Sequence, residues 1–127
     1  MKIRNVILAG AVAAGGAVGF AGPAAADSGQ VYSVGAAAVS IFNDQNDVVT
    51  TCDRARDGEG TVGWISVRQA DGTWNAFPRV YNGGGVNTCR SGDFNVLREA
   101  APVRLYSCLQ NGPSGRPYSC GVATLNG

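Results

Sequence analysis

The side chains best equipped for chemistry in this 127-residue chain are carboxylates gathered in short polar segments. Asp53, Asp57 and Glu59 follow one another closely, with Arg54 and Arg56 between them. Two carboxylates held across a cleft, about 5–10 Å apart, can hydrolyse a glycosidic bond. Carboxylates interleaved with arginines are more often part of a solvated, self-paired turn, so a carboxylate-based hydrolase ranks last among the functions considered.

A second polar segment offers hard oxygen ligands for calcium. Asp44 and Asp47 stand beside Asn43 and Asn46, and extracellular calcium sites can be weak. The alternative is a polar turn between two strands, where Asx residues are common. Asp44 and Asp47 are therefore weak calcium candidates, and no resident cofactor or other metal is expected.

Histidine is absent from the chain. This removes the commonest general base, the commonest zinc ligand and every Ser–His or Cys–His nucleophile pair. No other catalytic motif stands out, so the sequence predicts a protein that is not an enzyme.

The first 26 residues have the pattern of a cleavable export signal. Lys2 and Arg4 precede an apolar run over residues 6–20, and small residues at 22–26 form a cleavage site. An uncleaved anchor is the alternative, but a spanning helix needs about 20 apolar residues. We expect a signal peptide over 1–26 and one secreted, extracellular domain over 27–127. That domain carries a net charge of about −1, which favours neither nucleic acid nor a membrane as partner.

Four cysteines fall in the expected mature domain. An even count in a short exported chain predicts disulfides. Three pairings are possible, and we prefer Cys52–Cys89 with Cys108–Cys120, because the second pair brackets a turn-forming segment over residues 111–115. A zinc site is disfavoured because the chain has neither a CxxC pair nor histidine.

Turn residues recur every 8–12 positions and separate short runs of β-branched and aromatic residues. This spacing predicts an all-β fold, a small antiparallel β-sandwich of Greek-key or immunoglobulin-like type with about seven or eight strands and two disulfides. In the clearest strand, 61–69, Val62 and Trp64 share one face, and Ile65 and Val67 the other. The expected strands cover residues 36–43, 48–52, 61–69, 74–81, 86–90, 94–97, 103–109 and 118–125.

Two surfaces could bind a partner. Trp74, beside the Asp71-Gly72 turn, and Tyr81 could form an exposed platform for a sugar or a protein. The alternative, which we favour, is that both tryptophans pack in the core. The disulfide-bracketed loop 110–117 presents Arg116 much as a secreted protease inhibitor presents its loop, although Pro117 after Arg116 is a poor partner for a trypsin-like cut.

Lysine occurs only at position 2, and Asp-Gly turns and the motif VRLYSC…YSC mark the expected mature domain. In these features the chain resembles small secreted β proteins of actinobacteria, the Streptomyces type. The resemblance implies an extracellular location and a two-disulfide β fold, and it carries no functional residues across.

The sequence thus predicts a secreted, non-enzymatic protein that binds an extracellular protein or a glycan. The alternatives are a protease inhibitor, a carbohydrate- or calcium-binding module and, last, a small hydrolase.

Overall fold

The computed structural model describes residues 28–96 and 101–125. The expected signal peptide and the end of the expected strand at Leu97 lie outside these ranges. The described residues form nine strands and no helix. The strands are β1 (Gly29–Tyr32), β2 (Ala38–Asn43), β3 (Val48–Asp53), β4 (Gly60–Arg68), β5 (Trp74–Ala76), β6 (Val80–Asn82), β7 (Cys89–Asp93), β8 (Val103–Gln110) and β9 (Tyr118–Leu125).

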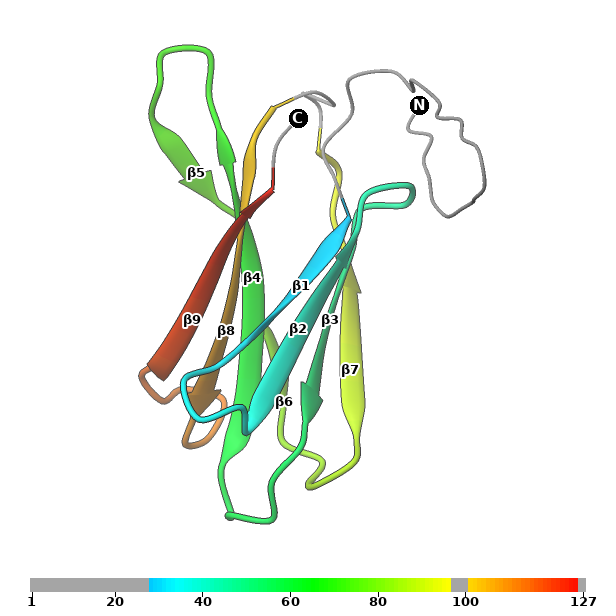
Figure 1. Ribbon diagram of the computed structural model, residues 1–127, viewed down its shortest axis with the longest axis vertical. Coiled ribbons are helices and arrows are strands. Elements are labelled where there is room, and N and C mark those ends of the chain that lie inside the picture. Colours follow the sequence, from blue (N-terminus) through cyan, green and yellow to red (C-terminus); the bar gives the residue numbers. More distant parts are fainter. Residues whose placement is uncertain (1–27, 97–100, 126–127) are drawn as a thin grey trace, which may run out of the picture.

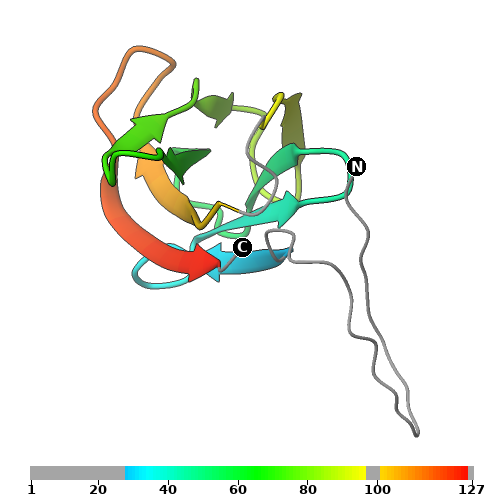
Figure 2. The same ribbon diagram turned by 90° about the horizontal axis from the view of Figure 1, so that it is seen from above.

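The strands form two antiparallel sheets that face each other (Figure 1). One sheet has four strands in the order β1-β2-β3-β7, and the other has five, β5-β4-β8-β9, with β6 paired to the same side of β4 as β5. The pairings of β3 with β7 and of β4 with β8 join strands that are distant in sequence, as Greek-key connections do. Seen from above, the sheets curve around a shared interior (Figure 2). The predicted all-β sandwich is therefore confirmed.

Three strand predictions need correction. β1 was not predicted because its four residues, GQVY, are too few and too polar to stand out. The strand expected over 74–81 is split into β5 and β6 around Pro78, whose missing N–H interrupts a ladder. The strands expected over 86–90 and 94–97 are replaced by one strand, β7, and residues 94–96 form no strand. Gly92 within β7 lies against the side chains of Val80 and Phe94, so a larger residue would force them to shift.

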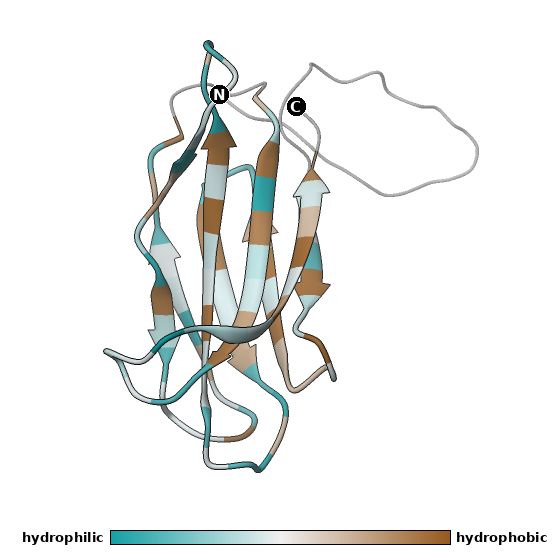
Figure 3. Ribbon diagram, turned by 90° about the vertical axis from the view of Figure 1, so that its left-hand side faces the viewer, coloured by the Kyte–Doolittle hydropathy of each residue, from teal (hydrophilic) through white to brown (hydrophobic). Residues whose placement is uncertain are grey.

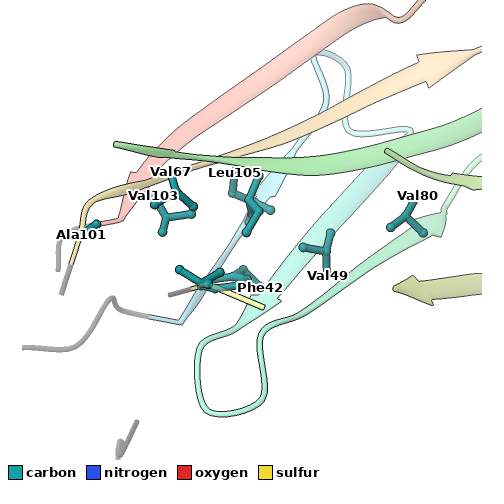
Figure 4. Close-up of a cluster of buried hydrophobic side chains, with 9 residues drawn as sticks. Phe42, Val49, Val67, Val80, Ala101, Val103 and Leu105 are labelled. Carbon is teal, nitrogen blue, oxygen red and sulfur yellow. The ribbon is translucent and has the colours of Figure 1, made fainter. Parts of the chain in front are cut away.

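The hydrophobic core lies between the sheets (Figure 4). Alternation along β4 and β8 turns Ile65, Val67, Val103 and Leu105 inward, and Phe42 meets them from the opposite sheet. The resulting pattern of apolar and polar bands is visible along the strands in Figure 3. The whole cluster contains Phe42, Val49, Ile65, Val67, Val80, Val96, Ala101, Val103 and Leu105.

Part of the interior is filled by small, polar residues. Ser40, Thr51, Thr61 and Ser107 are all fully buried, and the hydroxyl of Thr51 donates to that of Thr61 over 3.1 Å. Gly63 lies so close to Ser40 on the facing sheet that any side chain would collide with its hydroxyl. Small residues therefore let the two sheets approach closely here, whereas the larger, mostly branched side chains of the core cluster hold the sheets further apart.

The edges of the two sheets meet where β1 lies against β9. The backbone N–H of Val34, just after β1, donates to the carbonyl of Ser119 in β9 over 2.9 Å. Gly121 lies directly against the backbone carbonyl of Tyr32, with no space for a Cβ. This contact covers two edges that would otherwise present unpaired backbone groups.

Both predicted disulfides are present, Cys52–Cys89 and Cys108–Cys120. Each joins neighbouring strands of one sheet, β3 to β7 and β8 to β9, whereas the immunoglobulin disulfide joins the two sheets. Their loops of 37 and 12 residues correspond to about 4 and about 3 kcal/mol in the chain-entropy model. Within the described ranges, no helix has the length and apolar character needed to cross a membrane.

The contact between β1 and β9 can be tested with Gly121→Ala. The added methyl group must push the Tyr32 carbonyl away, so we expect the free energy of unfolding to fall by about 1–3 kcal/mol. Val122→Ala is the matched control, because Val122 is the next residue on β9 and is half exposed; its effect should be within about 0.5 kcal/mol. Urea denaturation measures both, and equal stabilities for the two variants would contradict the close approach.

Candidate functional site

The outer face of the five-stranded sheet carries stacked aromatic side chains. The register of β4 and β8 sets Trp64 directly opposite Tyr106. Since Ile65 and Leu105 point into the core, these neighbours point outward. Their rings are parallel within 6°, with centroids 4.6 Å apart, and both side chains are half-buried.

Two arginines complete this surface. The guanidinium of Arg79 lies 4.7 Å from the centroid of the Trp64 ring, and that of Arg104 lies 3.9 Å from the centroid of Trp74. Arg79 immediately precedes β6, on the side of β4 away from β8, so Trp64 is held between Arg79 and Tyr106. We call the five residues Trp64, Trp74, Arg79, Arg104 and Tyr106 the arginine–aromatic face.

The strands of this sheet carry charge of one sign only. None of the five strands β4, β5, β6, β8 and β9 contains an aspartate or a glutamate. In the part of the chain that the structure describes, stacking on tryptophan is the only side-chain interaction of Arg79 and Arg104. Their N–H donors are thus left for water or for a ligand.

The other sheet offers a contrast. Arg54 stacks on Tyr32, with its guanidinium 4.9 Å from the ring centroid, but it also donates to the carbonyl of Ala36 over 3.5 Å. Strands β3 and β7 of this sheet contain Asp53 and Asp93. A stacked arginine therefore occurs on both sheets, but only the five-stranded sheet is without acidic residues.

The candidate platform residues Trp74 and Tyr81 do share a face. Trp74 pairs with Arg68 and Tyr81 with Val62, so the two aromatics lie at opposite ends of β4, about 20 Å apart along the strand. Tyr81 packs over Gly60 and Gly83, which makes it part of the fold at that end.

The expectation that both tryptophans pack in the core is wrong. Trp64 and Trp74 are half-buried and neither belongs to the core cluster, because alternation along β4 gives the interior to Ile65 and Val67. Arg116, the third candidate, is exposed in the loop between β8 and β9. Arg116 is not among the residues of the arginine–aromatic face.

The calcium candidates Asp44 and Asp47 form the turn between β2 and β3, and both are buried. Oδ1 of Asp44 accepts a hydrogen bond from the Ser28 hydroxyl over 2.7 Å, and Oδ2 of Asp47 accepts one from the Val96 N–H over 3.1 Å. These bonds tie the turn to segments distant in sequence. No group of three or more potential ligands for a metal is found among the described residues.

The acidic loop residues likewise have local structural contacts. Asp53 is buried and accepts from the N–H of Ala55, and Asp57 accepts from the N–H of Glu59. Glu59 accepts a hydrogen bond from the Tyr118 hydroxyl over 2.8 Å, which ties this loop to the start of β9.

Sequence reasoning missed Arg79 and the pairing of Trp64 with Tyr106. Alternation along each strand already put Arg104 and Tyr106 on one face, but nothing local sets β8 next to β4 or fixes their register. Comparisons with protein-family models, with curated proteins and with solved structures find no match to this chain.

The Tyr118–Glu59 contact yields a test in alkaline solution. The hydrogen bond to Glu59, with smaller contributions from burial and from the nearby carboxylates, raises the pKa of Tyr118 above its ordinary value. A raised pKa in the folded state stabilises the fold at pH values below the ordinary tyrosine pKa, and this stabilisation is lost as the pH rises through the raised value. We expect Glu59→Gln to lower the pKa of Tyr118, measured by tyrosinate absorbance.

Tyr118→Phe shows which absorbance change in that titration belongs to Tyr118. Asp57→Asn serves as the control and should change the pKa little, because the Asp57 charge is the smallest contributor to the raised pKa. The same titration curve for the wild type and Glu59→Gln would show that the hydrogen bond is absent in solution.

Proposed function

We propose that this chain is a secreted, non-enzymatic binding protein whose ligand docks on the arginine–aromatic face. The observation that carries the proposal is a sheet of five strands without one acidic residue, on which two guanidinium groups are held over tryptophan rings with their donors unused by described residues. Arginine and aromatic residues are also the types most enriched where proteins bind partners.

The stacking prepares these side chains for binding. An arginine that is mobile in solution loses rotamer freedom when it binds, at a cost of about 0.5–1.5 kcal/mol. Arg79 and Arg104 are already positioned by Trp64 and Trp74, so part of this cost is met on folding. The strands beneath are hydrogen-bonded on both sides of β4 and β8, which gives the face a rigid base.

Secretion is the second part of the proposal. It is supported by the signal pattern over residues 1–26 and by the two disulfides, which persist in oxidising compartments.

Protease inhibition has less support. The loop between β8 and β9 folds back on itself, with the N–H of Gly115 donating to the carbonyl of Gly112. The Gln110 side chain donates to the carbonyls of Gly112 and Pro113 within the same loop. Inhibition therefore stays an alternative that a panel of secreted proteases can test.

The binding face can be tested with a panel of soluble polysaccharides, neutral and acidic, measured by isothermal titration calorimetry. We expect at least one to bind, and Trp64→Ala and Trp74→Ala each to weaken that binding about tenfold, because each removes the ring under an arginine. Tyr32→Ala is the matched control, since it removes the ring under Arg54 on the opposite sheet. It should change the affinity less than about twofold.

Binding that is unaffected by both tryptophan variants, or equally weakened by Tyr32→Ala, would place the ligand elsewhere. Circular dichroism of each variant establishes that the fold is retained. If none of the polysaccharides in the panel binds, the proposed function is wrong.

A further inference from the structure

We infer that the ligand of the arginine–aromatic face is an acidic polysaccharide, a sugar polymer that carries carboxylate or sulfate groups at intervals along its length. This inference rests on the proposed function and adds the chemical class of the ligand. It follows from the groups that the face exposes, from the position of its two arginines over different rings and from the ring faces that the stacking covers.

Both faces of the Trp64 ring and one face of the Trp74 ring are already occupied. Trp64 has Tyr106 on one side and Arg79 on the other, and Trp74 has Arg104 over its ring. A neutral sugar that binds by stacking needs an open ring face, and to reach either side of Trp64 it would have to displace Arg79 or Tyr106. Where the two tryptophan rings carry an arginine, the group that a ligand meets is therefore a guanidinium ion.

A stacked guanidinium keeps its hydrogen-bond donors available. These donors lie in the plane of the group and form a fork that matches a carboxylate or another planar pair of anionic oxygens. An arginine lying over a ring thus presents its edge to a ligand. Arg79 and Arg104 both have this arrangement, and no aspartate or glutamate in the five strands competes for them.

The two arginines are separated across the sheet. Arg104 pairs in register with Ser66, whereas Arg79 lies beside Trp64 on the far side of β4. The two residues are separated by two inter-strand distances across the sheet and by two residues along the strand, which puts their Cα atoms about 12 Å apart. Their guanidinium groups lie over different tryptophan rings, so a polymer with repeated anionic groups can contact both arginines at once and gain from the second contact.

Two other macromolecules fit less well. A folded protein partner usually takes its anchoring aromatic and arginine side chains into matching, fully desolvated pockets, whereas here the arginines and the tryptophan rings are stacked on one another on the outside of a sheet. Single-stranded nucleic acid binds by stacking its bases on open aromatic rings, and here both faces of Trp64 and one face of Trp74 are covered. Both are outcomes that the test below can reveal.

The test uses one polymer in two charge states. Polygalacturonate and its fully methyl-esterified form share a backbone and differ in the carboxylates. We expect binding to polygalacturonate and to dextran sulfate, and none to the ester or to unmodified dextran. The affinity for the acidic polymers should fall at least tenfold between 0.05 M and 1 M salt, because screening shortens the reach of charge from about 14 Å to about 3 Å.

Two substitutions assign the binding to the arginines. Arg79→Gln and Arg104→Gln should each weaken binding to polygalacturonate about three- to tenfold, and the double variant should weaken it further. Arg54→Gln is the matched control, because Arg54 is a stacked arginine on the opposite sheet; it removes the same net charge and should have less than a twofold effect. Arg104→Lys keeps the charge and loses the fork, so it should only partly restore the affinity.

The outcomes separate the two proposals. One result would be that the protein binds the neutral polymers without salt dependence and loses that binding in Trp64→Ala. This result would overturn the inference of an acidic ligand but would support the proposed binding face. Equal losses in Arg54→Gln and Arg104→Gln would show a non-specific charge effect and would also overturn the inference. If single-stranded DNA or an acidic protein binds more tightly than every acidic polysaccharide, the ligand class is wrong.

Discussion

The pairing of β4 with β8 is the interaction on which the rest of this molecule depends. Eight consecutive residue pairs, from Gly60 with Gln110 to Val67 with Val103, fix the register of the two central strands of the five-stranded sheet. One set of side chains, including Ile65 and Leu105, then fills the core, and the other set, including Trp64 and Tyr106, is stacked on the outside. A shift of one residue would exchange the two sets.

The outer faces of the two sheets differ in how their arginines are held and in their acidic residues. Cation–π contacts at exposed sites contribute about 0.5–1 kcal/mol each, so the stacks on Trp64 and Trp74 are modest in energy. Their main effect is to position charge. On the four-stranded sheet Arg54 also stacks, but it bonds to the backbone and shares its sheet with Asp53 and Asp93. Only the five-stranded sheet combines fixed guanidinium groups with strands that carry no acid.

Much of the fold could be predicted from the sequence, because period-two patterns and turn residues are local signals. The Asp71-Gly72 turn, the shared face of Ile65 and Val67, and both disulfides are confirmed. The errors arose where tertiary contacts decide. β7 continues through Gly92 because β3 and Val80 lie beside it, and Arg79 reaches Trp64 only because β6 pairs with β4. The candidate site had the same limit: Trp74 was identified, but its arginine partner comes from β8.

The most direct measurement is an NMR titration of the isotope-labelled protein with polygalacturonate. The chain has two tryptophans, and both lie on the arginine–aromatic face, so its spectrum contains two indole N–H signals that report on this surface. We predict that both indole signals and the Nε–H signals of Arg79 and Arg104 shift in a saturable way, while the Arg54 signal stays unchanged. Saturable shifts confined to residues around Tyr32 and Arg54, with both indole signals unmoved, would contradict the assignment of the binding face.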